Sequence, residues 1–404
     1  MQRREAMELL AGEFIRWQTP YGRLDPKVCP FVDTSTLVSS MNFHAPTFLA
    51  IALYKAAARL GRPEWKAAAD RYVVGYLACL REPQSEPDFY TQTWTAHMDE
   101  KHGPDADRTA WALHILTWPF IYGMALAAYR HFRVHNPGEL ALESKASALY
   151  EWLQFYRWDE GSYYRNGYGL PKAGIVDCGN SDDNCHIGRG LIAYHAVTRR
   201  ADVLRDAAGL ARYYLTDCVP GTYQGVWNPR EGTWVIGPTA ADGIEHLTAT
   251  KSSEASWGFT NTGAIEFLTE LAAVTTDEAL CAEIAAKCAA AMRWSFDACQ
   301  FEDGAIGLGG RDDKWLGMTA GAVMSFLRTR EAGFLSPEIE AASAPRAQRA
   351  AAWLLEHTDP DSVAAGGYVP VTGRTELRPP DNGAWMLGLT LEGLTMLDDL
   401  GGGD

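Results

Sequence analysis

Apolar residues recur along this chain with the spacing of an α-helix, in twelve segments of two alternating kinds. Segments such as 47–60 and 182–199 are apolar on nearly every side, whereas 64–80 and 202–217 carry a charged face. A helix that is apolar all round is buried, and one with a charged face lies outside. Six inner helices alternating with six outer ones therefore predict an all-α fold, an (α/α)6 toroid of six helical hairpins. The expected inner helices are 47–60, 107–133, 182–199, 253–273, 314–330 and 381–400, and the expected outer helices are 5–17, 64–80, 139–156, 202–217, 277–296 and 345–357.

The lengths of the connections indicate where a functional site lies. Long loops precede the expected inner helices, whereas the breaks that follow them are short, except around 333–344. One rim of the toroid then carries most of the irregular chain together with the first turns of the inner helices. Function concentrates in loops on a rigid scaffold, so we expect the site at this rim.

Polar and aromatic side chains gather at these helix starts and in the loops before them. A purely structural toroid would need only capping residues there. We therefore expect a single cleft lined by substrate-binding residues. The candidates are Asn42, His44, Trp94, His97, Arg108, Asn184, His186, Glu254, Trp257, Asp313, Trp315 and Asn382.

Composition narrows the possible partners. The 404 residues contain no Pro/Ser-rich linker, so we expect one domain over residues 1–404. A net charge of −15 argues against nucleic acid and anionic membrane surfaces as partners, and no apolar run is long enough to cross a membrane. The charged, amphipathic beginning of the chain predicts a cytoplasmic protein, or a secreted one if a signal has been removed.

The cysteines and histidines do not suggest a bound metal. Eight cysteines are scattered without C-x-x-C spacing, which is typical of reduced thiols and not of a disulfide framework or a zinc site. The four histidines near the expected rim lack H-x-x-x-H spacing; they are His44, His97, His186 and His246. We expect neither a metal nor another cofactor.

Two adjacent carboxylates mark the start of the third expected inner helix. Ser181 is a candidate N-cap, which would place Asp182 and Asp183 in the first turn. The helix dipole stabilises a carboxylate there, while each carboxyl raises the proton affinity of the other. A glycosidase needs one ionised and one protonated carboxyl in its active site. An isolated Asp-Asp pair is more often only a cap, so this interpretation depends on the surroundings.

Those surroundings suit a sugar. The chain holds 14 Trp and 17 Tyr, and several lie in expected loops, Trp94 and Trp227 among them. Aromatic faces bind the C–H faces of sugars, while carboxylates, amides and Arg bind the hydroxyls. We therefore expect an oligosaccharide or polysaccharide as partner.

The stretch around the pair resembles the α-1,6-mannanase family of six-hairpin glycosidases. The resemblance is carried by Ser181-Asp182-Asp183-Asn184 with the helix after it, by Gly225-Val226-Trp227-Asn228, and by Ser256-Trp257-Gly258-Phe259-Thr260-Asn261 before an apolar helix. It covers roughly residues 177–290. It implies a glycoside hydrolase of retaining mechanism, with Asp182 as nucleophile and Asp183 as acid/base.

Other chemistries fit the same residues. A uronate lyase or sugar epimerase would abstract a proton with His44, His186 or Tyr164, while Asn42 or Arg108 neutralises a substrate carboxylate. A sugar-binding toroid without catalysis is a further alternative. A prenyl-cyclising α-barrel fits less well, because Asp182 and Asp183 lack the further acidic residue that a metal–diphosphate site needs.

Overall fold

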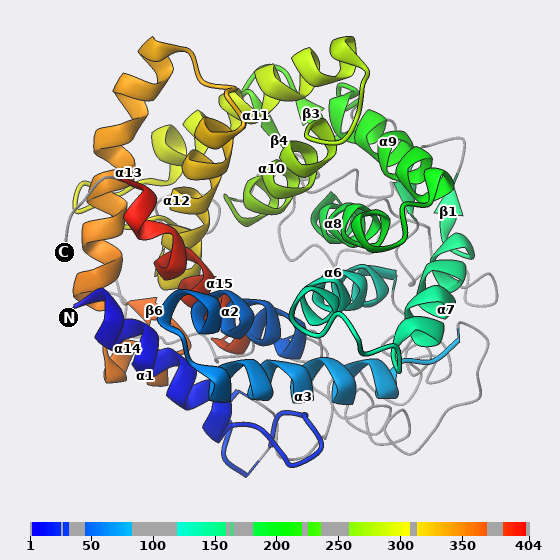
Figure 1. Ribbon diagram of the computed structural model, residues 1–404. Helices are drawn as coiled ribbons and strands as arrows, with labels where there is room; N and C mark the ends of the chain where they lie inside the picture. The colour runs from blue at the N-terminus through cyan, green and yellow to red at the C-terminus, as the bar shows by residue number, and fades with distance from the viewer. Residues whose placement is uncertain are drawn as a thin grey trace, which may run out of the picture.

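The computed structural model describes residues 2–25, 27–31, 45–82, 119–158, 163–164, 181–219, 225–235, 258–307, 313–369 and 383–400. Within these residues an inner ring of helices is surrounded by an outer ring (Figure 1). The inner helices are α2 (Ala45–Leu60), α6 (Pro119–His135), α8 (Ser181–Thr198), α10 (Gly258–Ala272), α12 (Leu316–Glu331) and α15 (Gly383–Met396). The outer helices are α1 (Arg3–Arg16), α3 (Pro63–Cys79), α7 (Glu143–Gln154), α9 (Ala201–Leu215), α11 (Glu278–Cys299) and α13 (Pro337–His357). The predicted all-α toroid is confirmed.

The alternation of the two helix types has the predicted physical basis. Helices α2, α12 and α15 are buried along most of their length, whereas α3, α9 and α13 bury one side only. The ring is closed by α1, which packs against α15 and α2, and Arg3 and Arg59 both pair with Asp398 beyond α15. None of the described helices combines the length and apolar character needed to cross a membrane. The seven described cysteines are free thiols, as predicted.

The inner helices run parallel, so their N-terminal ends meet at one rim. Phe48 near the start of α2 contacts His186 of α8, with ring centroids 5.4 Å apart, and Trp385 of α15, with centroids 5.7 Å apart. Phe120 at the start of α6 lies 5.1 Å from His186. Helices α10 and α12 join the same end, because Gly263 packs against Cys185 and Gly317 packs against Met386.

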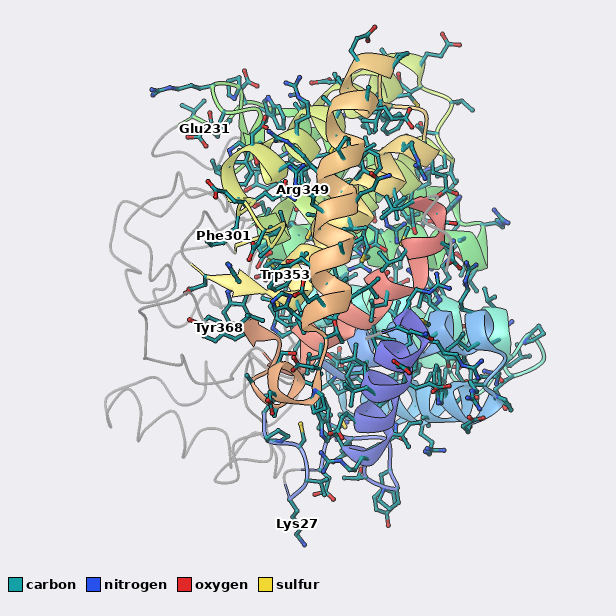
Figure 2. The ribbon with its side chains drawn as sticks, turned by 90° about the vertical axis from the view of Figure 1, so that its left-hand side faces the viewer. Lys27, Glu231, Phe301, Arg349, Trp353 and Tyr368 are labelled. Atoms are coloured by element: carbon teal, nitrogen blue, oxygen red, sulfur yellow. The ribbon has the colours of Figure 1, made fainter. Side chains whose placement is uncertain are left out.

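Short antiparallel strand pairs lie before four of the described inner helices. They are β1 (Arg157–Trp158) with β2 (Tyr163–Tyr164), β3 (Trp227–Asn228) with β4 (Thr233–Trp234), and β5 (Lys314–Trp315) with β6 (Tyr368–Val369). The first two pairs are hairpins, whereas β5 and β6 come from the connections before α12 and α15. Figure 2 shows Glu231, Phe301 and Tyr368, which belong to these connections, on the same side of the ring. The described part of the long connections therefore shares one rim, as the loop lengths predicted.

Three predicted helix starts were wrong. Helix α7 begins at Glu143, not at 139, because the chain before it forms turns, in one of which the backbone N of Glu143 donates to the carbonyl oxygen of Leu140 at 3.0 Å. Helix α13 begins at Pro337, not at Pro345, because the Ser336 side chain caps it by accepting from the backbone N of Ile339 at 3.3 Å. Pro345 then lies inside the helix, where it removes one hydrogen bond without ending it. Helix α12 begins at Leu316, because Lys314 and Trp315 pair with β6. The expected starts at 107, 253 and 381 lie outside the described residues. The short α14 (Pro360–Ala364) and a 3₁₀ turn (Leu397–Leu400) were not predicted.

Candidate active site

The first turn of α8 is anchored by its own first residue. Ser181 is fully buried, and its Oγ donates to the carbonyl oxygen of Val235 at 2.6 Å. The Tyr214 hydroxyl donates to the Ser181 carbonyl. Ser181 is thus the first helical residue and not the predicted N-cap. Asp182 and Asp183 do lie in the first turn, as predicted.

The two aspartates form an electrostatically coupled pair. Asp183 is buried, and Oδ1 of Asp182 is buried although that residue is partly exposed as a whole. Burial raises the pKa of Asp182 well above its ordinary value, and the negative charge of Asp183 raises it further. The Thr260 hydroxyl opposes this shift without cancelling it. The environment therefore favours a proton on Asp182.

An aromatic floor lies one turn further along α8. We use this name for Phe48, Phe120, His186 and Trp385, whose rings come from α2, α6, α8 and α15. Phe48 meets the imidazole of His186 edge-on at an interplanar angle of 85°, and Phe120 meets it at 56°. These contacts confine the ring of His186 at the N-terminal end of the inner helices.

His186 also receives a hydrogen bond from its own helix. Nη1 of Arg189 lies 3.2 Å from Nδ1 of His186, in a buried environment. A guanidinium has donors only, so Nδ1 accepts. A general base needs a free lone pair on the nitrogen that faces the substrate proton. The lone pair of Nδ1 is therefore engaged by Arg189, so this nitrogen cannot take a proton from a substrate.

Below the aromatic floor, charged side chains meet on the axis of the ring. We call this set the ionic layer: Lys55 (α2), Arg130 (α6), Arg189 (α8), Glu266 and Glu270 (α10), Arg328 (α12) and Glu392 (α15). Glu266 lies at its centre, 2.7 Å from Arg189 and 2.6 Å from Arg328. Burial is the largest effect and would raise the pKa of Glu266, but Arg189, Arg328, Lys55 and His186 together outweigh it and lower that pKa. All the described inner helices contribute to the layer.

The ionic layer was not predicted, although the sequence carries a signal for it. Phe48 and Lys55, Asp182 and Arg189, and Trp385 and Glu392 are each seven residues apart. That spacing repeats the same helix face about two turns, or about 10 Å, further along. A charged residue seven positions after a rim residue, inside a nearly apolar helix, indicates a second layer on the axis.

Three side chains near the pair have the chemistry of metal ligands. A carboxylate oxygen of Asp182, Sγ of Cys185 and a ring nitrogen of His186 all lie within 4.8 Å of one another. Burial raises the pKa of the Cys185 thiol well above its ordinary value, and Asp182 favours its protonated form. Nδ1 of His186 already accepts from Arg189. Metal ligands must be deprotonated and have a free lone pair, so a metal here would have to displace protons from Asp182 and Cys185.

Two other candidates on and beside α8 have mainly structural partners. The side-chain amide of Asn184 bonds both backbone groups of Tyr164, accepting from its N at 2.9 Å and donating to its O at 3.0 Å. Asn184 thus clamps β2 to α8, and its substrate contact stays a prediction. Tyr164 is itself buried near Tyr150 and Asp206, and burial raises the pKa of its hydroxyl well above the ordinary value.

Trp315 and Asp313 lie at the start of α12, on the same rim. Trp315 is buried and packs edge-on against Tyr368 at 5.1 Å, and its Nε1 has no acceptor among the described residues. Asp313 is half-buried and accepts from the Tyr368 hydroxyl at 3.4 Å. Trp227 and Trp234 are buried against each other beside α10 and α11, as core residues. The remaining candidates lie outside the described residues; they are Asn42, His44, Trp94, His97, Arg108, Glu254, Trp257 and Asn382.

Comparison of the sequence with known protein families gives no match, and no curated protein matches it. Solved structures do resemble the fold. A cellobiose 2-epimerase from Bacillus thermoamylovorans is 11% identical, with a TM-score of 0.63 over 96% of this chain and 98% of that chain. The α-1,6-mannanase GH76A of Salegentibacter sp. is 9% identical, with a TM-score of 0.60 over 98% and 99% of the two chains.

That mannanase structure is of an inactive variant in which two consecutive aspartates are replaced, in complex with α-1,6-mannotetrose. A glycosyl hydrolase of family 88 from Bacteroides vulgatus is 10% identical, with a TM-score of 0.59 over 97% and 99% of the chains. At these identities the likeness establishes the shared toroid fold. The structural neighbours are carbohydrate-active enzymes of several reaction types.

Proposed function

We propose that this protein is a glycoside hydrolase that cleaves an oligosaccharide or polysaccharide with Asp182 and Asp183. The observation that carries the proposal is the coupled pair at the start of α8, in which burial and Asp183 favour a proton on Asp182. Glycoside hydrolysis needs one protonated and one ionised carboxyl at the scissile bond. The mannanase with the same fold, which is inactive when its two consecutive aspartates are replaced, supports this assignment.

The environment of the pair suggests how the two roles are divided. The resemblance to the mannanase family implies Asp182 as nucleophile and Asp183 as acid/base. The raised pKa of Asp182 favours the reverse, because a general acid must hold its proton near neutral pH. We therefore assign proton donation to Asp182 and the charged role to Asp183. Trp315, whose Nε1 has no acceptor among the described residues, is a candidate contact for the sugar.

The lyase and epimerase alternatives fit two of their three candidate bases poorly. Nδ1 of His186 accepts from Arg189, so the other ring nitrogen of the neutral imidazole carries the hydrogen. Tyr164 is buried beside Tyr150 and Asp206, and burial disfavours its phenolate. The third base, His44, lies outside the described residues. The geometry thus supports the aspartate pair over these two bases.

The test is incubation with defined oligosaccharides followed by product analysis. Two probes follow from the structural neighbours: α-1,6-mannotetrose and cellobiose. A hydrolase adds water and creates a new reducing end, which a reducing-sugar assay and mass spectrometry detect. A lyase product absorbs in the ultraviolet, and an epimer has unchanged mass. A lyase also releases a reducing end, so the two reactions are told apart by the mass of the added water and by ultraviolet absorbance. An epimer, or an unsaturated product formed without the addition of water, across a panel of linkages would overturn the proposal.

Substitution of the pair then assigns the chemistry. Asp182→Asn and Asp183→Asn are each expected to lower turnover about 10²–10⁴-fold, and the double variant little further, because the two carboxyls act as a unit. Asp202→Asn is the matched control, since Asp202 also lies in the first turn of a helix but is partly exposed on the outer α9.

An aryl glycoside with a good leaving group needs little protonation. On such a substrate Asp182→Asn should retain more activity than Asp183→Asn. The opposite order would return the nucleophile role to Asp182, as the family resemblance implies.

A further inference from the structure

We propose that Arg189 is a positioning residue that holds His186 in a single tautomer, with its hydrogen on Nε2. The imidazole then serves the site as a hydrogen-bond donor and not as a base. Arg189 lies three residues after His186 on α8, so both side chains project from the same face of that helix.

The tautomer follows from the donor count at one short contact. Nη1 of Arg189 lies 3.2 Å from Nδ1 of His186. The guanidinium is always protonated and has no acceptor, so the lone pair of Nδ1 must face it. A neutral imidazole carries one hydrogen, which leaves it on Nε2. The other tautomer would place an N–H group against an N–H group.

Neither partner can turn away from this contact without disturbing its neighbours. The imidazole lies against Phe48 and Phe120, with centroid distances of 5.4 and 5.1 Å. Arg189 is held from the other side by Glu266, whose Oε2 lies 2.7 Å from its Nη2, and both side chains are buried. Glu266 is in turn bound by Arg328 of α12 at 2.6 Å. The chain of contacts runs from the aromatic floor into the ionic layer.

One consequence rests on the proposed function. If Asp182 and Asp183 move the protons in glycoside hydrolysis, a His186 locked as donor does not compete with them as a base. The tautomer itself does not depend on the reaction, and its measurement requires no substrate.

The experiment is a long-range proton–nitrogen correlation spectrum of the protein labelled with ¹⁵N at histidine. The His186→Gln variant identifies the His186 signals by their disappearance. The expected result in the unmodified protein is Nδ1 with the chemical shift of a bare nitrogen and Nε2 with that of a protonated one. Nδ1–H in the unmodified protein would overturn the proposal, whatever the variants show.

Arg189→Met and Arg328→Met form a matched pair, because each removes one of the two cations on Glu266. Only Arg189→Met removes the donor to His186 and is expected to populate both tautomers. Arg328→Met is expected to keep the single Nε2–H form. A single Nε2–H form in Arg189→Met, or an equal change in both variants, would contradict a positioning role. Absence of hydrolase activity in the unmodified protein, together with the expected Nε2–H spectrum, would count against the proposed function and not against this inference.

Discussion

At the scale of single residues, Asp182 is in an environment that opposes its ionised form. Its Oδ1 is buried, a ring nitrogen of His186 and Sγ of Cys185 lie within 4.8 Å of its carboxylate, and Asp183 follows it directly. Burial first, and then the charge of Asp183, raise the pKa of Asp182. A carboxyl with a raised pKa in the folded state makes folding less favourable once the unfolded chain has ionised.

We therefore predict that Asp182→Asn is more thermostable than the parent near neutral pH, although it loses activity. Below the ordinary pKa of 3.8, Asp182 is protonated in both folded and unfolded chains and adds no penalty. As the pH rises above that value, the folded state binds the extra proton, so the parent loses stability while the variant does not. Thermal unfolding midpoints measured from pH 3 to pH 8 should diverge with increasing pH.

Asp202→Asn is the control with the opposite sign. A hydrogen bond from Arg200 lowers the pKa of Asp202 to about 2, so this aspartate stabilises the fold at neutral pH and loses that effect in acid. The variant should be no more stable than the parent at pH 7. If Asp182→Asn also shows no gain above pH 5, its carboxyl is not kept protonated by the fold.

At the scale of elements, the crossing of α6 and α8 sets the position of the site. A Cβ on Gly190 would lie 2.2 Å from the carbonyl oxygen of Gly123, and a Cβ on Gly123 would lie 2.6 Å from Cα of Ile187. The two backbones thus approach as closely as glycine allows. His186 and Asp182 stand on the same helix, one and two turns before this contact. Their distance from Phe120 depends on how closely α6 and α8 pack.

We predict that Gly190→Ala destabilises the protein by about 1–3 kcal/mol, because the added methyl group overpacks the crossing. It should also lower activity, since α8 carries the aspartate pair. Gly209→Ala on α9 is the matched control: no atom lies within 4 Å of its Cβ position, and alanine favours a helix interior over glycine by about 0.5–1 kcal/mol. Thermal unfolding compares the two, and a loss of stability in both variants would refute the packing argument.

Helix types and their order were predictable because burial leaves a periodic record in the chain. The apolar stretch around Leu191 and the charged face of α9 follow that rule. Boundaries depend on single contacts with distant residues, which periodicity does not record. Trp315 could not be assigned to β5 without its partner Tyr368, and Ser181 could not be separated from an N-cap without Val235.

The candidate site was likewise predictable where the sequence itself carries the signal, and not where single contacts between distant residues decide. The acidic pair was visible because two carboxyls at a helix start are conspicuous in any sequence. The clamp of Asn184 on Tyr164 and the bond from Arg189 to His186 were not, because each depends on which atoms face each other. The ionic layer was partly predictable. Its seven-residue spacing is present in the sequence, but the pairing of its residues depends on contacts between different helices.

At the scale of the whole molecule, the ionic layer links helices that are distant in sequence. Lys55 of α2 pairs with Glu392 of α15, which Arg328 of α12 approaches to 3.6 Å. Glu266 then bridges Arg328 to Arg189 of α8. Because apolar packing is tolerant of rotation, a chain of directed ion pairs from each inner helix to the next defines how these helices are turned. The rings of the aromatic floor lie on the same helices, so the rotation of these helices also sets the orientation of those rings.

The last prediction follows from this role of Glu266. Glu266→Gln leaves two buried guanidinium groups without their shared carboxylate, which is expected to cost about 3–5 kcal/mol of stability. Glu270→Gln, one turn later on α10, is the matched control: its pair with Arg130 is at 2.9 Å, but the two side chains are 26% and 36% exposed. A partly exposed pair contributes less than about 1 kcal/mol.

The pH dependence separates a charge effect from a packing effect. Arg189 and Arg328 lower the pKa of Glu266 against the effect of burial, so its carboxylate stabilises the fold above the ordinary pKa of 4.5. That contribution declines as the pH falls below 4.5, because protons then bind the unfolded chain first. The gap between parent and Glu266→Gln, measured by thermal unfolding, should therefore be widest at neutral pH and narrow in acid. A gap that stays constant from pH 7 to pH 3 would assign Glu266 a packing role alone and remove the ionic layer as the element that orients the inner ring.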